Sequence, residues 1–118
     1  MKKIIFKFDK LFLQRAFINL IYNSLVHNDE NTRISITIDK KDKIFIYIED
    51  NGKGISKEDL KNLFKKYYRG TNTGESHKGS GLGMAIAKQI IEVHRGQIEV
   101  ESSLGVGTKI TVIFDCEI

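Results

Sequence analysis

The segment NLIYNSLVHN, residues 19–28, has the most informative residue pattern of the chain. Asn19, Asn23 and His27 recur at every fourth position, so in a helix they lie in one row, while leucine, isoleucine and valine occupy the other faces. Asparagine is a mediocre helix former, and a buried amide without a hydrogen-bond partner costs about 1–3 kcal/mol. The row therefore indicates a helix whose polar side faces a partner for these amides.

The residues on either side of this segment extend the helix and add strands. IIFKF (residues 4–8) predicts a short strand, and Asp9 is a suitable N-cap for one long helix that ends near Asn28. RISITIDK (residues 33–40) alternates isoleucine with polar residues, which predicts a strand buried on one face through its three isoleucines. KIFIYIED (residues 43–50) is apolar on both faces, which predicts a central strand covered on both sides.

The second half of the chain predicts two more helices and two more strands. Ser56 begins a helix with a capping-box pattern, and residues 69–80 are polar and glycine-rich, as in a long loop. A third helix begins near Leu82 and ends at Gly96, a residue suited to the left-handed C-cap. Two strands joined by SLGVGT follow. The apolar face of the third helix is expected to comprise Ile86, Ile90 and Val93.

Length and composition limit the protein classes that remain. The 118 residues are enough for one core, so residues 1–118 are expected to form a single domain of the α/β (α+β) class, with one mixed sheet and its helices on one face. The net charge of +4 comes from scattered lysines, and no basic motif indicates nucleic acid. No apolar run reaches the roughly 18–20 residues of a membrane span, and the single cysteine, Cys116, excludes an intrachain disulfide.

Three clusters carry groups suited to binding a ligand. The amide oxygens of Asn19 and Asn23 are hard, neutral ligands for Mg²⁺, although amides at a helix edge can also bond a neighbouring loop. Asp50, in the DNGKG turn, can accept a hydrogen bond from an exocyclic amine such as that of adenine, or the turn can serve topology alone. GSGLG at residues 79–83 precedes a helix, where free amides bind phosphate, or it is a hinge.

The glycines at residues 79–83 match neither of the two common nucleotide motifs. No Gly-Lys-Ser/Thr follows four variable residues, so the chain has no Walker A loop. The dinucleotide fingerprint is excluded because no strand precedes the glycines and their spacing differs. A glycine-rich turn at a helix N-terminus is what remains.

Taken in order, four stretches resemble a known set of motifs: NLIYNSLVHN, DNGKGI, FKKYYRG, and the run from GSGLGMAIAKQ to KITVIF. They resemble the N, first glycine, F and second glycine boxes of the catalytic ATP-binding domain of sensor histidine kinases, within the gyrase, heat-shock chaperone, MutL and histidine kinase superfamily. The resemblance covers Phe6 to Phe114. It implies the Bergerat fold, a two-layer sandwich of a mixed five-stranded sheet and three helices with a flexible ATP lid, and it implies ATP and Mg²⁺ as cofactors.

The resemblance also implies a role for individual residues. Asn23 would coordinate the Mg²⁺ that bridges the ATP phosphates, and Asn19 would line the same site. Asp50 would accept from the adenine amine. Arg69 would approach the γ-phosphate, so that Asn19, Asn23 and Arg69 form the expected catalytic set. The other expected nucleotide-binding residues are His27, Gly52, Gly54, Ile55, Tyr67, Gly79, Ser80, Gly81, Leu82, Gly83 and Thr108.

The N box departs from the family pattern NAxKY. Here residues 23–27 read NSLVH, so Val26 brings no lysine charge and His27 replaces the tyrosine that stacks on adenine. An imidazole can stack over a smaller area, and the alternative is a helix-end histidine at the surface. Tyr67 stands where the F box often has phenylalanine, and with Phe64 it is expected to anchor the lid in the core.

Asn19 affects whether the site is expected to hydrolyse ATP or to transfer its phosphoryl group. Members of the superfamily that hydrolyse ATP resemble one another in having a glutamate at this position as a general base, whereas the amide of Asn19 accepts no proton at neutral pH. The pocket is therefore expected to hold ATP and transfer its γ-phosphoryl to another nucleophile by positioning and charge neutralisation. The resemblance implies a protein histidine kinase that phosphorylates a histidine on a separate dimerisation domain and supplies a response regulator.

Two alternatives stay open: an anti-sigma-factor type serine kinase, and a nucleotide-sensing module without kinase activity. None of His27, His77 and His94 lies in an HExxP-like context, so the phosphoacceptor is expected to lie outside this chain. The expected small ligands are ATP and ADP, with no nucleic acid partner. The isolated domain is expected to be monomeric, and to be the cytoplasmic part of a receptor anchored in the inner or plasma membrane.

Overall fold

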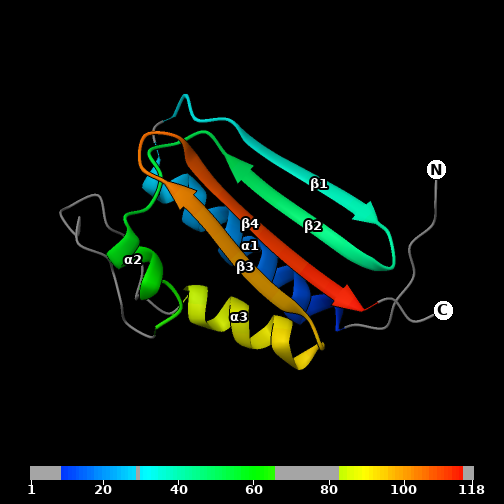
Figure 1. Ribbon diagram of the computed structural model, residues 1–118. Coiled ribbons are helices and arrows are strands. Elements are labelled where there is room, and N and C mark those ends of the chain that lie inside the picture. Colours follow the sequence, from blue (N-terminus) through cyan, green and yellow to red (C-terminus); the bar gives the residue numbers. More distant parts are fainter. Residues whose placement is uncertain (1–8, 29, 66–82, 116–118) are drawn as a thin grey trace.

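Four strands and three helices make up the described part of the chain in this computed structural model, residues 9–28, 30–65 and 83–115 (Figure 1). The strands lie in the order β1-β2-β4-β3, and each neighbouring pair is antiparallel. The helices cover one face of the sheet, with α1 and α3 side by side (Figure 1). The elements are α1 (Lys10–His27), β1 (Ile34–Lys40), β2 (Lys43–Asp50), α2 (Lys57–Lys61), α3 (Gly83–Val93), β3 (Gln97–Ser103) and β4 (Gly107–Asp115).

The predicted two-layer α+β architecture is confirmed, but the sheet differs in detail. The prediction was a mixed sheet of five strands, whereas the described sheet has four strands that are all antiparallel. The strand predicted at residues 4–8 lies outside the described residues. The mixed character therefore has no counterpart among the strands that the structure describes.

The hydrophobic core lies between the sheet and the helices α1 and α3. β2 and β4 pair along their whole length, with Ile44 opposite Phe114 and Ile48 opposite Ile110, and each of these four residues is 1% exposed. Full burial of such side chains contributes about 1.5–3 kcal/mol each. This pairing fixes the ends of β2 and β4 beside the helices. The helices contribute Leu13, Ala16, Leu20, Met84, Ala87 and Ile91.

Helix α1 begins and ends where the sequence predicts. The side chain of Asp9 caps it by accepting from the amide of Phe12 at 3.1 Å, and Asn28 is the C-cap. The amide of Asp9 donates to Nε2 of His94 at 2.9 Å, and Nδ1 of the same ring lies 2.8 Å from the carbonyl oxygen of Ile90. Since Nε2 accepts, Nδ1 carries the proton and donates. The imidazole therefore joins the start of α1 to the end of α3.

The isoleucines of β1 are more exposed than predicted. Ile36 and Ile38 lie opposite Ile48 and Ile46, on the side of the sheet that faces the helices, yet they are 54% and 59% exposed. β1 is an edge strand of the described sheet, and α1 and α3 lie over its other strands (Figure 1). The alternating pattern identified the strand and its inward face, but no described helix extends over this edge.

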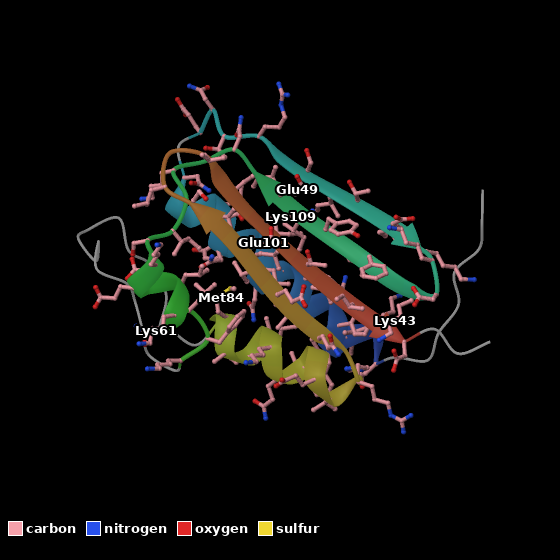
Figure 2. All side chains as sticks on the ribbon, in the orientation of Figure 1. Lys43, Glu49, Lys61, Met84, Glu101 and Lys109 are labelled. Carbon is pink, nitrogen blue, oxygen red and sulfur yellow. The ribbon has the colours of Figure 1, made fainter. Side chains whose placement is uncertain are left out.

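Among the described residues, helices cover β2 on one face only, which differs from the prediction of cover on both sides. Phe45 and Tyr47 lie on the open face, with their rings parallel and 6.2 Å apart. The amine of Lys109 lies 4.7 Å from the centre of the Tyr47 ring, and that of Lys41 lies 5.7 Å from Phe45. Figure 2 shows Lys109 on this face of the sheet. On this face, lysine side chains lie over the aromatic rings where the apolar pattern predicted a second layer of helices.

Helix α2 is short, and its predicted cap is confirmed. The Ser56 hydroxyl oxygen accepts from the amide of Asp59 at 3.1 Å, but the helix ends at Lys61. Phe64 follows in a turn, where it is half-buried and packs against the core. This agrees with the anchoring role expected of Phe64, while Tyr67 lies outside the described residues.

Helix α3 starts at Gly83, close to the predicted start, but its buried face is rotated from the prediction. Met84, Ala87 and Ile91 face the core, whereas Val93 is 75% exposed. The predicted Ile86 and Ile90 are half-buried at the edge of this face. None of the helices within residues 9–28, 30–65 and 83–115 is long and apolar enough to span a membrane.

The end of α3 places its left-handed residue at Arg95, with φ 63°, and not at Gly96 as predicted. The amide of Gly96 donates to the carbonyl of Ile91 at 2.8 Å, the long-range bond of a Schellman motif. Gly96 is required for another reason, since a Cβ there would lie 2.6 Å from the Phe114 ring. This glycine lets the chain pass directly over the core.

Candidate functional site

The polar row of α1 borders the first residue of α3. Asn19 and Asn23 are half-buried, and a Cβ placed on Gly83 would lie 3.9 Å from Cγ of Asn19. The first amides of a helix have no partner within that helix, and the helix dipole adds partial positive charge there. The structure thus brings an asparagine amide beside a helix N-terminus, an arrangement suited to an anion.

Asp50 lies at the end of β2 and is held there by two donors. The hydroxyl of Ser24 donates to Oδ2 at 3.0 Å, and the amide of Gly52 donates to Oδ1 at 3.0 Å. Ser24 is 5% exposed, and it follows Asn23 directly on α1. An ionised carboxylate has about four acceptor positions, so two remain for a ligand. This contact ties the carboxylate to the helix that carries the asparagine row.

The sequence predicted no role for Ser24, which appeared only as the serine in NSLVH where the family pattern NAxKY has alanine. Its place on the helix nevertheless indicated a buried hydroxyl. A hydroxyl on the core-facing side of a helix needs a hydrogen-bond partner, because a buried polar group without one is unfavourable. That signal predicts a partner but does not say which residue it is, since Asp50 lies 26 positions away in the sequence.

Asn28 connects the end of α1 to the turn that follows β2. Its Nδ2 donates to the carbonyl of Ser24 at 2.9 Å, and its Oδ1 accepts from the amide of Lys53 at 3.1 Å. A Cβ at Gly52 would overlap the amide group of Asn28. Gly52 is therefore required where the turn passes against α1, and the turn is fixed relative to Asp50. Asn28 is a second residue that sequence reasoning missed.

Two glycines allow the loops beside Asp50 to approach one another. Gly54 has φ 78°, and a Cβ there would overlap the carbonyl oxygen of Ser103. Gly107 has φ 141°, and a Cβ there would overlap the carbonyl oxygen of Asp50. Both positions combine a conformation that favours glycine with a close backbone contact. They pack the β3–β4 turn against the segment after β2.

Thr108 lies opposite Asp50 in the pairing of β2 with β4, so both side chains point to the helix side of the sheet. Its hydroxyl lies 2.8 Å from Oγ of Ser102, which accepts from the amide of Ile55 at 2.8 Å and donates to the carbonyl of Gly107 at 3.0 Å. Because Ser102 has a single hydroxyl proton, Thr108 must donate to it. The Thr108 oxygen is then an acceptor toward the space beside Asp50.

The predicted site residues divide into those that the structure brings together and those it does not describe. The first group lies at one end of the sheet and along the adjoining side of α1: Asn19, Asn23, Asp50, Gly52, Gly54, Ile55, Gly83 and Thr108. His27 is the last residue of α1, and its side chain is not described. The residues outside the described part are Tyr67, Arg69, Gly79, Ser80, Gly81 and Leu82.

Within the described residues, few side chains are suited to bind a metal ion. No group of three or more histidine, cysteine, aspartate or glutamate side chains within them could hold a metal ion. Mg²⁺ differs from metals that need a protein cage, because it keeps several waters and relies on substrate phosphates. The amide oxygens of Asn19 and Asn23 fit that coordination, with the remaining ligands from phosphate and water.

Comparison with protein families agrees with this geometry. Residues 8–118 match the family model described as histidine kinase-, DNA gyrase B-, and HSP90-like ATPase. The chain belongs to this ATPase family. The family expected from the four boxes is therefore confirmed, and ATP is the nucleotide that membership supports.

Curated relatives of this ATPase domain are sensor kinases. The chain is 42% identical over 110 residues to sensor histidine kinase YvrG of Bacillus subtilis (strain 168), a match that covers 92% of this chain and 19% of the relative. It is 40% identical over 109 residues to sensor protein RprX of Bacteroides fragilis (strain YCH46), covering 88% of this chain and 21% of the relative. The chain thus spans about a fifth of the length of these relatives.

Two solved structures similar to this domain are also from histidine kinases. The mycobacterial sensor histidine kinase MprB aligns with TM-score 0.79 at 26% identity, covering 97% of this chain and 77% of that one. The nucleotide-free catalytic domain of histidine kinase ThkA aligns with TM-score 0.75 at 26% identity, covering 92% of this chain and 69% of that one. Both similarities extend over most of the chain, so they concern the whole domain.

Proposed function

We propose that this chain is the catalytic ATP-binding domain of a two-component sensor histidine kinase. It binds Mg-ATP and transfers the γ-phosphoryl group to a histidine on a dimerisation domain outside this chain. The observation that carries the proposal is the position of Asp50, held by Ser24 and Gly52 next to the asparagine row of α1. One end of this arrangement suits a purine, and the other suits phosphates.

The purine end depends on acceptors of fixed direction. Each oxygen of the Asp50 carboxylate already accepts one protein hydrogen bond, which limits its rotation and leaves free lone pairs for a ligand. The exocyclic amine of adenine is a donor, so it matches this group. The Thr108 oxygen is a second acceptor on the same side of the sheet. A guanine carbonyl at the same position would face acceptors and be disfavoured.

The phosphate end depends on α1 and α3. Asn23 presents an amide oxygen that would hold Mg²⁺, Asn19 would line the same site, and the ion would supply charge neutralisation between the phosphates. The N-terminus of α3 at Gly83 lies beside Asn19, where helix amides favour an anion. Arg69, Gly79, Ser80, Gly81 and Leu82 complete this end in the proposal.

The amide at position 19 favours transfer over hydrolysis. Asn19 accepts no proton from water at neutral pH, so this side chain is not a general base for hydrolysis. The γ-phosphoryl group passes from the β-phosphate oxygen of ATP to an imidazole nitrogen, leaving ADP. The contribution of the domain is to orient the phosphate chain and to neutralise its charge during that transfer. The dimerisation domain provides the nucleophile.

The parent protein and its partners follow from the same proposal. The phosphorylated histidine would pass its phosphoryl group to a response regulator. The whole kinase is proposed to be anchored in the inner or plasma membrane, with this domain on the cytoplasmic side and monomeric when isolated. Nucleic acid is not part of the proposed function.

Phosphotransfer to a supplied acceptor tests the proposal. The chain is incubated with γ-labelled ATP, Mg²⁺ and the separately produced dimerisation domain of a relative such as YvrG. We expect an acid-labile, base-stable phosphohistidine on that domain, and none with the Asn23→Ala variant. An acid-stable phosphoserine on an anti-sigma partner protein would instead support a serine kinase. ATP binding without any transfer would support a nucleotide-sensing module.

A further inference from the structure

The side of α1 that faces away from the core is apolar, although it is exposed. Leu11, Ile18, Tyr22 and Leu25 are each at least half exposed. A surface helix normally carries polar residues on the face opposite the core. The opposite side of α1 is buried in the core, so this face points away from the sheet, behind which α1 lies in Figure 1. Exposed apolar residues gathered on one face indicate a contact surface.

The spacing of these residues is that of a helix–helix seam. Positions 11, 15, 18, 22 and 25 alternate steps of four and three, the a and d positions of a heptad repeat. They extend over about 21 Å along the helix axis. Four of the five positions are apolar and the fifth is Arg15, which is also exposed. We call this set the α1 outer seam. It does not include Asn19 or Asn23.

Arg15 sets the charge of the partner. A charged residue within an apolar seam specifies which helix can pair with it, because an unpaired charge in the contact is unfavourable. Helix α1, Lys10–His27, contains no aspartate or glutamate. Arg15 therefore has no acidic neighbour on its own helix. A matching helix would supply a carboxylate opposite Arg15.

A second copy of the same helix does not meet this requirement. In a parallel pair Arg15 would face its own counterpart, which is a repulsive contact. In an antiparallel pair centred on Ile18, Arg15 would lie near Tyr22 of the other copy, again without a carboxylate. Charge complementarity thus favours a different helix over self-association.

We propose that the α1 outer seam docks an amphipathic helix that has an apolar seam and a carboxylate opposite Arg15. That helix belongs to another part of a sensor kinase, since the curated relatives are about five times as long as the matched domain. The inference rests on the proposed function only for the source of the helix. It assigns α1 two separate faces, one toward the nucleotide and one toward a partner helix.

Peptide binding tests this docking surface. The probes are two labelled amphipathic peptides of about three heptads with leucine at a and d, identical except for glutamate or lysine at one seam position. We expect the glutamate peptide to bind the chain about tenfold more tightly than the lysine peptide in a fluorescence anisotropy titration. The Arg15→Glu variant should reverse this preference, and Ile18→Ser should weaken both peptides about tenfold.

The control variant is Val93→Ser, which changes a still more exposed apolar residue on α3 and should leave peptide binding unchanged. Equal binding of the two peptides, or equal effects of Ile18→Ser and Val93→Ser, would overturn the proposal. So would seam-dependent dimerisation of the chain in sedimentation, or seam-dependent binding to phosphatidylserine vesicles in place of the peptide. ATP affinity is measured on the same samples. Peptide binding without ATP binding would refute only the proposed function, and the converse would refute only the docking surface.

Discussion

Replacing Ser24 by alanine removes one of the two donors that hold the Asp50 carboxylate. The hydroxyl lies 3.0 Å from Oδ2, and Ser24 is 5% exposed. A hydrogen bond to a charged group contributes about 1.5–3 kcal/mol, but Asp50 is half-buried, so water recovers part of this. Alanine is also the better helix former, by about 0.5 kcal/mol. We therefore expect the free energy of unfolding to fall by about 1 kcal/mol or less.

The effect on nucleotide binding should exceed the effect on stability. Without Ser24, the Gly52 amide is the one donor to this carboxylate that remains among the described residues, so the carboxylate must lose rotational freedom when a ligand binds. A cost of about 1 kcal/mol corresponds to a dissociation constant for Mg-ATP about fivefold higher. Calorimetric titration measures this constant, and urea unfolding measures stability. The control is Gln14→Ala, at an exposed position of the same helix, which should change neither quantity appreciably.

A double-mutant cycle with Asp50→Asn isolates the pair. If Ser24 acts through Asp50, removing the hydroxyl should weaken ATP binding less in the Asp50→Asn background than in the parent, with a coupling energy of about 1 kcal/mol. Strictly additive effects would refute this reasoning, as would an unchanged ATP affinity in Ser24→Ala. Either result would mean that the observed hydrogen bond does not orient the carboxylate for a ligand.

Substitutions at three further positions test other parts of the site and its support. Asn23→Ala should abolish most of the Mg²⁺ dependence of ATP binding while the far-ultraviolet circular dichroism stays unchanged; the same dependence as the parent would exclude a metal-ligand role. Gly54→Ala should lower the free energy of unfolding by about 1–3 kcal/mol, because φ is 78° and a Cβ overlaps the Ser103 carbonyl; an unaltered urea midpoint would contradict this. His94→Ala should lower the free energy of unfolding by about 1 kcal/mol, because the imidazole of His94 bonds both the Asp9 amide at the start of α1 and the Ile90 carbonyl of α3. His94→Gln should lower it less, because the glutamine oxygen can still accept from the Asp9 amide. Equal losses would show that the bond to the Asp9 amide contributes nothing.

Local patterns in the sequence predicted the elements well. The Asp9 cap, the helix from there to Asn28 and the alternation in residues 33–40 depend on neighbouring residues, and each matches the structure. The Ser56 cap is confirmed in the same way. These features are set by backbone hydrogen bonding and side-chain periodicity within a few residues, so they can be recognised without a fold.

Features that depend on distant residues were predicted less well. Ile36 and Ile38 are exposed because β1 lies at the edge of the described sheet, which alternation cannot reveal. Phe45 and Tyr47 match a buried strand in composition, yet they face the open side of a two-layer fold. The partner of Ser24 comes from a strand 26 residues away. The order of the four boxes indicates the family, whereas these contacts depend on how the helices and strands pack in three dimensions.

In the proposed site Asp50 holds the adenine of a bound nucleotide, which calorimetric titration of Mg-ATP and Mg-GTP into the parent and Asp50→Asn can test. We expect the parent to bind ATP more tightly than GTP. We also expect Asp50→Asn to weaken ATP binding about tenfold or more, because an amide nitrogen then faces the adenine amine. The same ATP affinity in both proteins, with no preference over GTP, would contradict it.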